Sequence, residues 1–241
     1  MRIATFNLLH GRSLEDGQVD LDRLAAAVGA LDADVLGLQE VDRGQERSHR
    51  ADLAAVAAHA MGAVDHRFVP AFAEPAGGDS GIALLTRYPV VSWQVLRLPR
   101  APVRVPLWIP DLGRVVAVRD EPRVALAAVL DAPSGRYTVC TTHLSFVPGM
   151  NRWQLRRLVR SLADLPGPLI LTGDLNLGPR AAARITGLRP LATAATFPAA
   201  RPRRQLDHLL AGSGVRGVGP ADALQMSVSD HRALVVACDL G

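Results

Sequence analysis

The sequence predicts an α/β protein in which part of the sheet structure is antiparallel. Close to the N-terminus, a segment with strand-like alternation is followed by a helical pattern and then by a continuous apolar run. In the middle of the chain, several short apolar segments follow one another, separated by turn residues. A strand, a helix and a strand in succession indicate layered α/β structure, whereas consecutive strands favour antiparallel pairing.

The first elements are separated by changes in the hydrophobic period. Residues 2–8 alternate between apolar and polar, which predicts a strand. Apolar residues then recur at helical spacing from 20 to 31, with Asp20 in position to cap the helix. The apolar run 34–40 predicts a buried strand whose polar end is Glu40.

The remaining elements follow the same patterns. Further helices are predicted at 51–61, around 155–162 and from Pro179, because proline suits the first helical turn. Further strands are expected at 81–86, 90–98, 114–118, 123–130, 136–142, 169–171, 206–210 and 232–238. The segment 98–111, rich in proline and arginine, is expected to be the longest loop.

The composition is that of a globular protein with enough apolar material for a large core. Of the 241 residues, 49% are hydrophobic and 21% are charged. The candidate site residues described below come from both ends of the chain, so a shared site requires the two ends to meet. We therefore expect a single domain over 1–241.

The positive charge has two interpretations. The formal net charge is +4 and the sequence pI is about 10.0, yet the chain contains no lysine. A basic chain is typical of proteins that bind polyanions, but an arginine-rich composition without lysine also arises from coding bias. We favour compositional bias, and the charge alone does not identify a substrate.

Cysteine usage and the absence of an apolar leader point to a cytoplasmic protein. Cys140 and Cys238 each lie in an apolar run, which predicts buried core thiols rather than a metal site. The chain opens with a predicted strand, and no apolar run is long enough to cross a bilayer. We expect no stable membrane anchor, and no protein partner is predicted.

Two polar residues at predicted strand ends suit a hard cation. Glu40 ends a buried strand, and its carboxylate is a suitable ligand for Mg²⁺ or Mn²⁺. Asn7 ends the neighbouring strand, where it can supply an amide oxygen or hold that carboxylate in place. The alternative for Glu40 is a solvated charge at a strand end, and the apolar run before it favours the metal site.

The tetrapeptide Gly173-Asp174-Leu175-Asn176 follows another apolar run. Its spacing predicts that Asp174 and Asn176 share one face of a strand, so that a carboxylate and an amide converge on one phosphate or water. This arrangement suits a general base with a positioning partner. The alternative is an ordinary turn, in which Gly, Asp and Asn are common.

Two histidines follow or precede predicted strands. His231, in Ser229-Asp230-His231, lies just before the last strand, where an imidazole can protonate or hydrogen-bond a phosphate oxygen. Asp207 starts another apolar strand and is the candidate to orient this imidazole. His143 ends a strand and is the predicted second imidazole of the site.

Taken in order, these segments resemble the endonuclease/exonuclease/phosphatase superfamily, which includes pancreatic deoxyribonuclease, apurinic-site endonucleases, neutral sphingomyelinases and inositol-polyphosphate phosphatases. The resemblance covers nearly the whole chain. The matching segments are Thr5-Phe6-Asn7, Leu38-Gln39-Glu40-Val41, Gly81-Ile82-Ala83-Leu84-Leu85-Thr86-Arg87-Tyr88-Pro89, Thr142-His143-Leu144, Gly173-Asp174-Leu175-Asn176, Leu206-Asp207-His208 and Ser229-Asp230-His231. The resemblance implies a four-layer sandwich of two mixed β-sheets flanked by helices, with the site at one rim.

The resemblance also implies a metal site. Glu40 would bind Mg²⁺ or Mn²⁺, and Asn7 and Asp230 would complete or support that site. In several members of the superfamily a further acidic residue supports the first histidine, and Asp79 is the candidate for this contact with His143.

The catalytic roles implied by the resemblance belong to five residues. Asp174 would activate a water molecule, which Asn176 would align. His231, together with Asp207 and His143, would stabilise the transition state at phosphorus.

These roles predict a metal-dependent phosphoester hydrolase, and most directly a phosphodiesterase or nuclease. The substrate contains phosphate, with DNA and RNA among the candidates, and Arg43 and Arg204 are the predicted substrate-binding residues because they lie nearest the motifs. The alternatives are a phosphatase or a phospholipase C-type enzyme that acts on a small or lipid-borne phosphate. A non-catalytic binding module is less favoured, because no site residue is missing.

A lipid-directed enzyme needs an apolar loop that can enter a membrane surface. The segment 103–110 contains Trp108 and is the candidate for such a loop. The favoured alternative is that Trp108 is buried within a β-hairpin.

Overall fold

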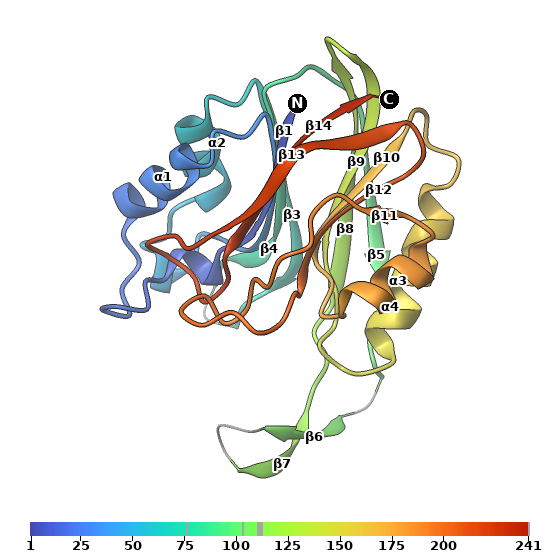
Figure 1. The fold of residues 1–241 in the computed structure, drawn as a ribbon. Coiled ribbons are helices and arrows are strands. Elements are labelled where there is room, and N and C mark those ends of the chain that lie inside the picture. The colour runs from blue at the N-terminus through green and yellow to red at the C-terminus, as the bar shows by residue number, and fades with distance from the viewer. Residues whose placement is uncertain (76, 103, 110–112, 241) are drawn as a thin grey trace.

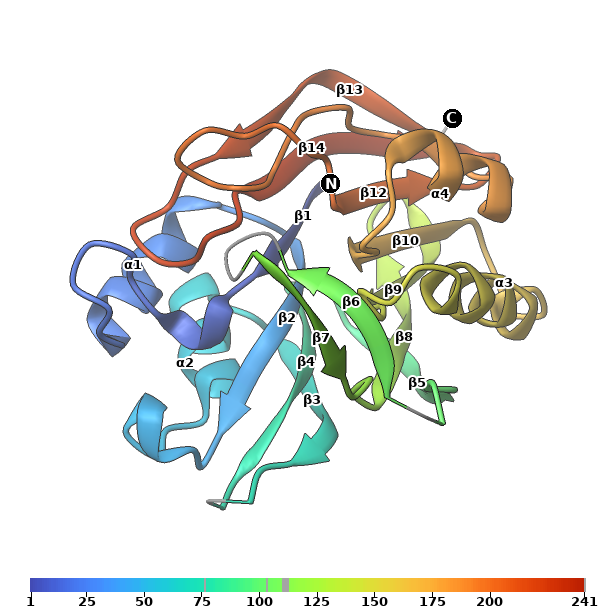
Figure 2. The same ribbon diagram turned by 90° about the horizontal axis from the view of Figure 1, so that it is seen from below.

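The computed structural model describes residues 1–75, 77–102, 104–109 and 113–240, and the chain forms four layers (Figure 1). Two six-stranded sheets pack against each other. Helices α1 (Leu21–Ala30) and α2 (Leu53–Met61) cover the outer face of the first sheet, and α3 (Met150–Leu162) and α4 (Pro179–Thr186) cover that of the second (Figure 2). The predicted sandwich of two mixed sheets flanked by helices is confirmed.

The first sheet brings the two ends of the chain together. Its strands, in spatial order, are β13 (Val215–Leu224), β14 (Ala233–Leu240), β1 (Arg2–Asn7), β2 (Val35–Arg43), β4 (Asp79–Thr86) and β3 (Asp65–Ala73). Strand β1 runs parallel to β2 and antiparallel to β14. The end of β1 at Asn7 and the segment 229–231 that leads into β14 therefore lie at the same edge.

The second sheet places three predicted site residues side by side. Its strands, in spatial order, are β11 (Arg189–Pro190), β12 (Asp207–Ala211), β10 (Leu169–Asp174), β9 (Gly135–His143), β8 (Arg123–Ala132) and β5 (Val90–Leu98). In the register of this sheet, Asp174 lies opposite His143 on one side and opposite Asp207 on the other.

Three apolar interfaces hold the layers together. One lies between α1 and α2 and the first sheet and includes Phe6, and a second lies between the two sheets and includes Tyr137. The third lies between the second sheet and α3 and α4 and includes Leu158. Each such fully buried side chain stabilises the fold by about 1.5–3 kcal/mol. Cys140 and Cys238 are buried in these cores with free thiols, as predicted.

Most predicted elements are present with shifted ends. Asp20 caps α1 through its side chain, which accepts hydrogen bonds from the backbone of Asp22 and Arg23. Short 3-10 turns, η1 (Leu9–Gly11) and η2 (Glu46–Ser48), follow β1 and β2. None of the described helices has both the length and the apolar character needed to cross a membrane.

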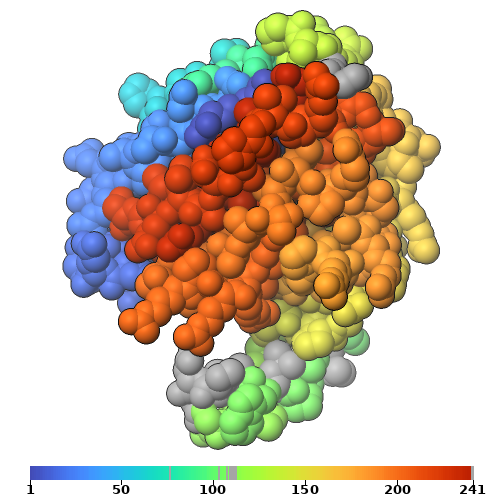
Figure 3. All heavy atoms as spheres, viewed as in Figure 1, coloured from blue at the N-terminus to red at the C-terminus, as the bar shows by residue number. Residues whose placement is uncertain are grey.

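The expectation of a long loop at 98–111 is wrong for 105–109. These residues form β6 (Val105–Ile109), which pairs with β7 (Arg114–Val118) in a hairpin that extends away from the body of the molecule (Figure 3). Residues 103, 110 and 111 lie outside the described residues. The side chain of Trp108 is 61% exposed, so the predicted burial of this residue within the hairpin is also wrong.

Candidate active site

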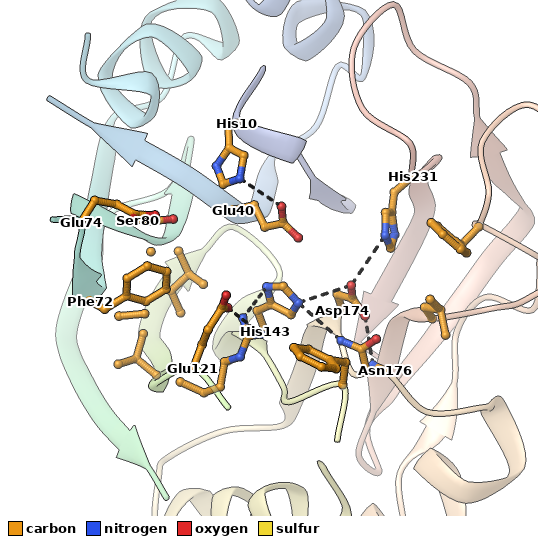
Figure 4. Close-up of a pocket in the computed structure, with 18 of the residues that line it drawn as sticks. His10, Glu40, Phe72, Glu74, Ser80, Glu121, His143, Asp174, Asn176 and His231 are labelled. Atoms are coloured by element: carbon orange, nitrogen blue, oxygen red, sulfur yellow. Dashed lines mark hydrogen bonds and ion pairs between the residues drawn. The ribbon is translucent and has the colours of Figure 1, made fainter. Parts of the chain in front are cut away.

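Strand ends from both sheets meet at one rim of the sandwich and surround a pocket of about 420 Å³ (Figure 4). The pocket is lined by the predicted site residues Glu40, His143, Asp174, Asn176, Arg204 and His231. Asn7 and Asp207 are hydrogen-bonded to residues that line the pocket. Asp230 directly precedes the lining residue His231 in the chain. Residues from both ends of the sequence therefore share one site, as the sequence predicts.

Asn7 joins the two sheets within the site. Its Nδ2 donates to Oε1 of Glu40 at 2.9 Å and to Oδ2 of Asp174 at 3.2 Å. Its Oδ1 accepts from the backbone N–H of Leu9 at 3.1 Å. Asn7 is only 1% exposed, so breaking this bridge would leave buried polar groups unpaired. In this orientation Asn7 holds the carboxylates and does not present an oxygen to the pocket.

Glu40 is directed by a break in the sheet. The pairing of β2 with β4 shifts between Gln39 and Val41, and Glu40 has a φ of 52°, in the left-handed region. A non-glycine residue in this region is strained, and the bulge turns its side chain away from the regular strand alternation. The Glu40 carboxylate therefore points into the pocket instead of along the face of the sheet.

The predicted common strand face of Asp174 and Asn176 is wrong. Strand β10 ends at Asp174, and Asn176 lies in the following turn with a φ of 49°. The turn is stabilised by a hydrogen bond from the backbone N–H of Asn176 to Oδ1 of Asp174 at 2.9 Å, as Asp side chains often form. Asn176 nevertheless reaches the pocket, where its Nδ2 donates to the carbonyl of Leu144 at 3.1 Å. The turn, and not the strand period, brings the two side chains together.

His231 is oriented by Asp207. Nδ1 of His231 lies 2.8 Å from Oδ2 of Asp207, and its Nε2 lies 3.8 Å from Oδ2 of Asp174. Burial lowers the pKa of His231, but the opposing effect of the Asp207 carboxylate, aided by Asp174, raises the pKa to about 9. His231 is therefore an imidazolium at neutral pH and can donate from Nε2.

His143, unlike His231, is a neutral imidazole. Nη1 of Arg123 lies 3.1 Å from its Nδ1, and its Nε2 lies 3.6 Å from Oδ2 of Asp174. A guanidinium has donors only, so Nδ1 accepts and the proton of the neutral ring is on Nε2. Burial, the charge of Arg123 and that of His231 hold the pKa of His143 well below its usual value.

The predicted contact between Asp79 and His143 is not formed. Asp79 instead accepts a hydrogen bond from Nη2 of Arg43 at 2.8 Å. The position beside Nδ1 of His143 is taken by a cation, Arg123, whose other amino group pairs with Glu121 at 3.0 Å. Together with burial, the charge of this guanidinium keeps the ring neutral, whereas a carboxylate in the same place would favour its protonation.

Asp174 lies between the two imidazoles and is 2% exposed. Burial and the neighbouring Asp207 raise its pKa to about 7, although His231, Asn176 and Asn7 act in the other direction. A carboxyl group with this pKa changes its protonation near neutral pH, which is the property required of a general base or acid.

Glu40 and Asp230 form a donor set that fits a hard cation. The Glu40 side chain is 26% exposed toward the pocket. Burial raises the pKa of Asp230, His231 opposes this effect and Glu40 adds to it, so the two carboxylates repel each other at this edge. A divalent cation with oxygen ligands would remove that repulsion, and Mg²⁺ prefers such ligands.

A second cluster is chemically less suited to a cation. One donor atom each of Asp174, Asp207 and His231 lies within 4.8 Å of the others. Nδ1 of His231 is already bonded to Asp207, and the imidazolium charge competes with a metal ion at this place. The other oxygen of Asp207, Oδ1, is buried without a hydrogen-bond partner in the described structure. Of the two places, the edge with Glu40 and Asp230 offers the carboxylate oxygens that a hard cation prefers, without a competing imidazolium among them.

The predicted arginines differ in position. Arg204 lines the pocket, whereas Arg43 does not; its guanidinium pairs with Asp79 and covers the ring of Phe68 at 4.5 Å. The arginine that β2 and its following turn bring to the pocket is Arg47, which bonds to the buried Asp42 at 2.7 Å. Arg43 therefore lies outside the pocket that its predicted substrate role requires.

Three residues that line the pocket and contact its carboxylates or histidines were not predicted as site residues from the sequence. Nε2 of His10 lies 3.5 Å from Glu40, and its Nδ1 lies 3.0 Å from Asp42. Arg47 and Arg123 complete the group. His10 follows the end of β1 closely and Arg123 begins β8 beside His143, so position next to a predicted strand end was the signal available for both.

A comparison with known families places the chain in one of them. The family model described as "Endonuclease/Exonuclease/phosphatase family" matches residues 4–231. The chain belongs to this family. Members of the family hydrolyse phosphoesters and generally use divalent metal ions, and they include nucleases and phosphatases. No curated protein sequence matches this family member.

Solved structures of the same family share its fold. An endonuclease/exonuclease/phosphatase from Beutenbergia cavernae is 24% identical with a TM-score of 0.75, over 100% of this chain and 72% of that one. A mannosyl-6-phosphatase from Bacteroides thetaiotaomicron is 17% identical with a TM-score of 0.68, over 99% of each chain. The sphingomyelinase C of Streptomyces griseocarneus is 17% identical with a TM-score of 0.62, over 98% of each chain. At these identities the likeness extends to the fold and does not identify a substrate.

Proposed function

We propose that this family member is a Mg²⁺- or Mn²⁺-dependent phosphodiesterase, and specifically a nuclease, that hydrolyses its substrate by in-line attack of water. The observation that carries the proposal is the position of Asp174 between two imidazole nitrogens, at 3.6 Å from His143 and 3.8 Å from His231. A buried carboxyl group in this position, with its pKa raised to about 7, is suited to accept the proton of an attacking water.

The two histidines would contribute in different ways because their protonation differs. His231, whose pKa is raised to about 9, supplies a positive charge and a proton at Nε2 for a phosphate oxygen or for the leaving group. Neutral His143 supplies an uncharged N–H donor at Nε2. Fixed donors aimed at developing charge typically contribute a factor of about 10²–10³ each to the rate.

The remaining residues would position these groups. Asn7 holds the carboxylates of Glu40 and Asp174 in register, and Asn176 caps the turn beside the water that Asp174 would activate. Asp207 fixes the orientation of His231. Arg204 and Arg47 line the pocket and favour a phosphate-containing substrate.

A metal ion held by Glu40 and Asp230 would neutralise charge on the phosphate oxygens. Glu40 is the side chain that reaches the pocket, and Asn7 sets its orientation. The proton transfers described above belong to the protein side chains and take place beside this metal site.

The proposal is tested by nicking of a supercoiled plasmid with purified protein and Mg²⁺ or Mn²⁺. We expect relaxed circles to form, chelator to prevent it, and His231→Ala to lower the rate roughly 10²-fold or more. His66→Ala is a matched control, because His66 is exposed on β3. If the wild-type protein leaves the plasmid intact but releases phosphate from sugar, inositol or lipid phosphates, the nuclease assignment is wrong and a phosphatase or phospholipase C-type activity takes its place.

A further inference from the structure

A groove between α3 and α4 carries an unusual density of arginine. It has a volume of about 700 Å³ and lies outside the pocket described above. Its lining consists of the apolar residues Val159, Ala181 and Ile185 and of five arginines, Arg152, Arg156, Arg160, Arg180 and Arg184. All five arginines are exposed. Neither helix contains an acidic residue, so the groove has a single sign of charge.

Helical spacing sets like charges next to one another along the groove, although Arg160 and Arg184 lie in last helical turns, where the helix dipole favours a cation. Arg152, Arg156 and Arg160 are four residues apart on α3, so neighbouring charges repel along one face. Arg152 and Arg180 lie in first helical turns, where the helix dipole disfavours a cation. In the described part of the chain, no ion pair or side-chain hydrogen bond of these five arginines offsets this repulsion. An anionic ligand that runs along the groove would do so.

An exposed tryptophan lies at the edge of the same groove. Trp153 is 49% exposed and shares a shallow pocket with Arg156, Arg157 and Arg160. Two of these arginines, Arg156 and Arg160, also line the groove. Arginines that contact phosphates, next to an aromatic ring on which a base can stack, are the combination that proteins use to bind single-stranded nucleic acid.

The groove begins at the candidate active site. Nδ2 of Asn151, in the first turn of α3, donates to the carbonyl of Asn176 at 2.9 Å. Helix α4 starts at Pro179, directly after the turn that contains Asn176. Both helices therefore start next to the rim, and they lie on the outer face of the second sheet (Figure 1). Arg152 is nearest the rim on α3, and Arg160 lies about 12 Å further along the helix.

A lipid surface fits this place less well. The arginines line a groove between two helices, and Trp153 is the one large apolar side chain among the described α3 and α4 residues that is strongly exposed. Binding to a membrane surface generally requires several apolar side chains on one face in addition to basic ones. A flexible strand of nucleotides can enter a groove, whereas a bilayer cannot.

We propose that the groove between α3 and α4 binds single-stranded nucleic acid, with the arginines on the phosphates and Trp153 stacked on a base, and that it holds the part of a substrate strand beyond the cleaved bond. The last part of this statement rests on the proposed nuclease function. The binding itself does not, because it can be measured without catalysis.

The test is binding of a fluorescein-labelled oligo(dT) 12-mer, measured by anisotropy in chelator so that no cleavage occurs. Arg156→Gln/Arg160→Gln is expected to weaken binding at least tenfold and to lower the slope of log affinity against log salt by about 1.4, since each lost phosphate contact removes about 0.7 for a single strand. Trp153→Ala is expected to weaken binding roughly tenfold and leave the salt slope unchanged.

The matched control is Arg67→Gln/Arg216→Gln, which removes the same charge from exposed arginines on β3 and β13 of the other sheet. It is expected to bind within twofold of the wild type. Equal weakening in the groove and control variants would overturn the proposal, because binding would then depend only on net charge. Equal competition by a duplex of the same length would overturn the single-strand assignment. If the groove variant loses binding to phosphatidylserine vesicles but still binds the oligonucleotide, the ligand of the groove is a membrane surface and not nucleic acid.

Hydrolysis of bis(p-nitrophenyl) phosphate separates this proposal from the proposed function. The groove variants are expected to hydrolyse this small diester at the wild-type rate, which also checks that they are folded. A wild-type protein that binds the oligonucleotide through the groove but does not hydrolyse the diester would contradict the proposed function and support the binding site. Diester hydrolysis by a protein whose oligonucleotide binding does not depend on the groove would support the proposed function and contradict the binding site.

Discussion

Arg123 donates a hydrogen bond from Nη1 to Nδ1 of His143 at 3.1 Å, and both side chains are buried. A cation in this position cannot accept the Nδ1 proton that a carboxylate would accept. The contact therefore fixes His143 as a neutral ring with its proton on Nε2, directed at Asp174. His231, bonded to Asp207, carries the positive charge of the pair.

The first prediction concerns this tautomer. Burial and the charge of Arg123 hold the pKa of His143 low, so Arg123→Gln should raise it and move the protonation of the ring toward neutral pH. Ring ¹⁵N NMR should find His143 of the wild type neutral and protonated at Nε2 throughout the range above pH 6. A ring that titrates near 6.5 in both proteins would contradict the role of Arg123.

The second prediction is a pH dependence of stability that comes from the His231–Asp207 pair. The pKa of His231 is raised to about 9 in the folded protein, so its contribution is fully present below the unfolded value of about 6.5 and is lost as pH rises through 9. Denaturant unfolding of wild type and His231→Ala should therefore differ more at pH 6 than at pH 10. A difference that is constant or grows over this range would show that the pair is not charged as described.

The third prediction concerns Asp174, whose pKa is raised to about 7 by burial and by Asp207. A carboxyl group with a raised pKa destabilises the folded protein as pH rises through that value. Asp174→Asn should lower turnover roughly 10²-fold or more, and in chelator at pH 8 its Tm should equal or exceed that of the wild type. A variant that keeps its activity would remove Asp174 from the role of base, and one that unfolds would assign it a structural role.

The fourth prediction concerns the metal. An ion that binds only the folded state stabilises it, by about 2.7 kcal/mol at a concentration of 100 Kd, which corresponds to a Tm increase of roughly 5 °C or more in a protein of this size. Mg²⁺ or Mn²⁺ should raise the Tm of the wild type, and Glu40→Gln should abolish the increase. Glu46 is exposed, and Glu46→Gln is the control in which the Tm increase is expected to remain. An increase that survives in Glu40→Gln but is lost in Asp207→Asn would move the ion to the other carboxylate cluster.

The sequence predicted the positions of the site residues better than their geometry. Asn7, His143 and Asp174 lie at strand ends, and strand ends follow from apolar runs that stop at a polar residue. The predicted strand end at Glu40 is wrong, because β2 continues to Arg43 and Glu40 lies at a bulge within it. The strand period failed at Asn176 because the chain turns there, with a left-handed backbone that a periodic pattern does not encode. The strand period could not predict the bulge at Glu40, because this residue also has a left-handed backbone.

Two larger misses have a physical cause in the burial of the strands. Strand β13 is mostly exposed and contains Gly and Pro, so it has neither the alternation nor the apolar run of a core strand. Strand β3 is only partly buried, and Pro70 in its middle argues against a strand. The hairpin of β6 and β7 was the favoured alternative for the segment 103–110, and within that alternative only the burial of Trp108 was wrong. The role of Arg123 was also out of reach, because it depends on which side chain faces Nδ1 of His143 across two neighbouring strands.

The most direct test of the account compares a phosphodiester with a phosphomonoester at this one site. Initial rates of p-nitrophenol release from bis(p-nitrophenyl) phosphate and from p-nitrophenyl phosphate would be measured with Mn²⁺ for wild type, Asp174→Asn and His66→Ala. We expect metal-dependent hydrolysis of the diester that is faster than that of the monoester, is lost in Asp174→Asn and is retained in His66→Ala. Hydrolysis of the monoester alone, or diester hydrolysis that persists in Asp174→Asn, would contradict it.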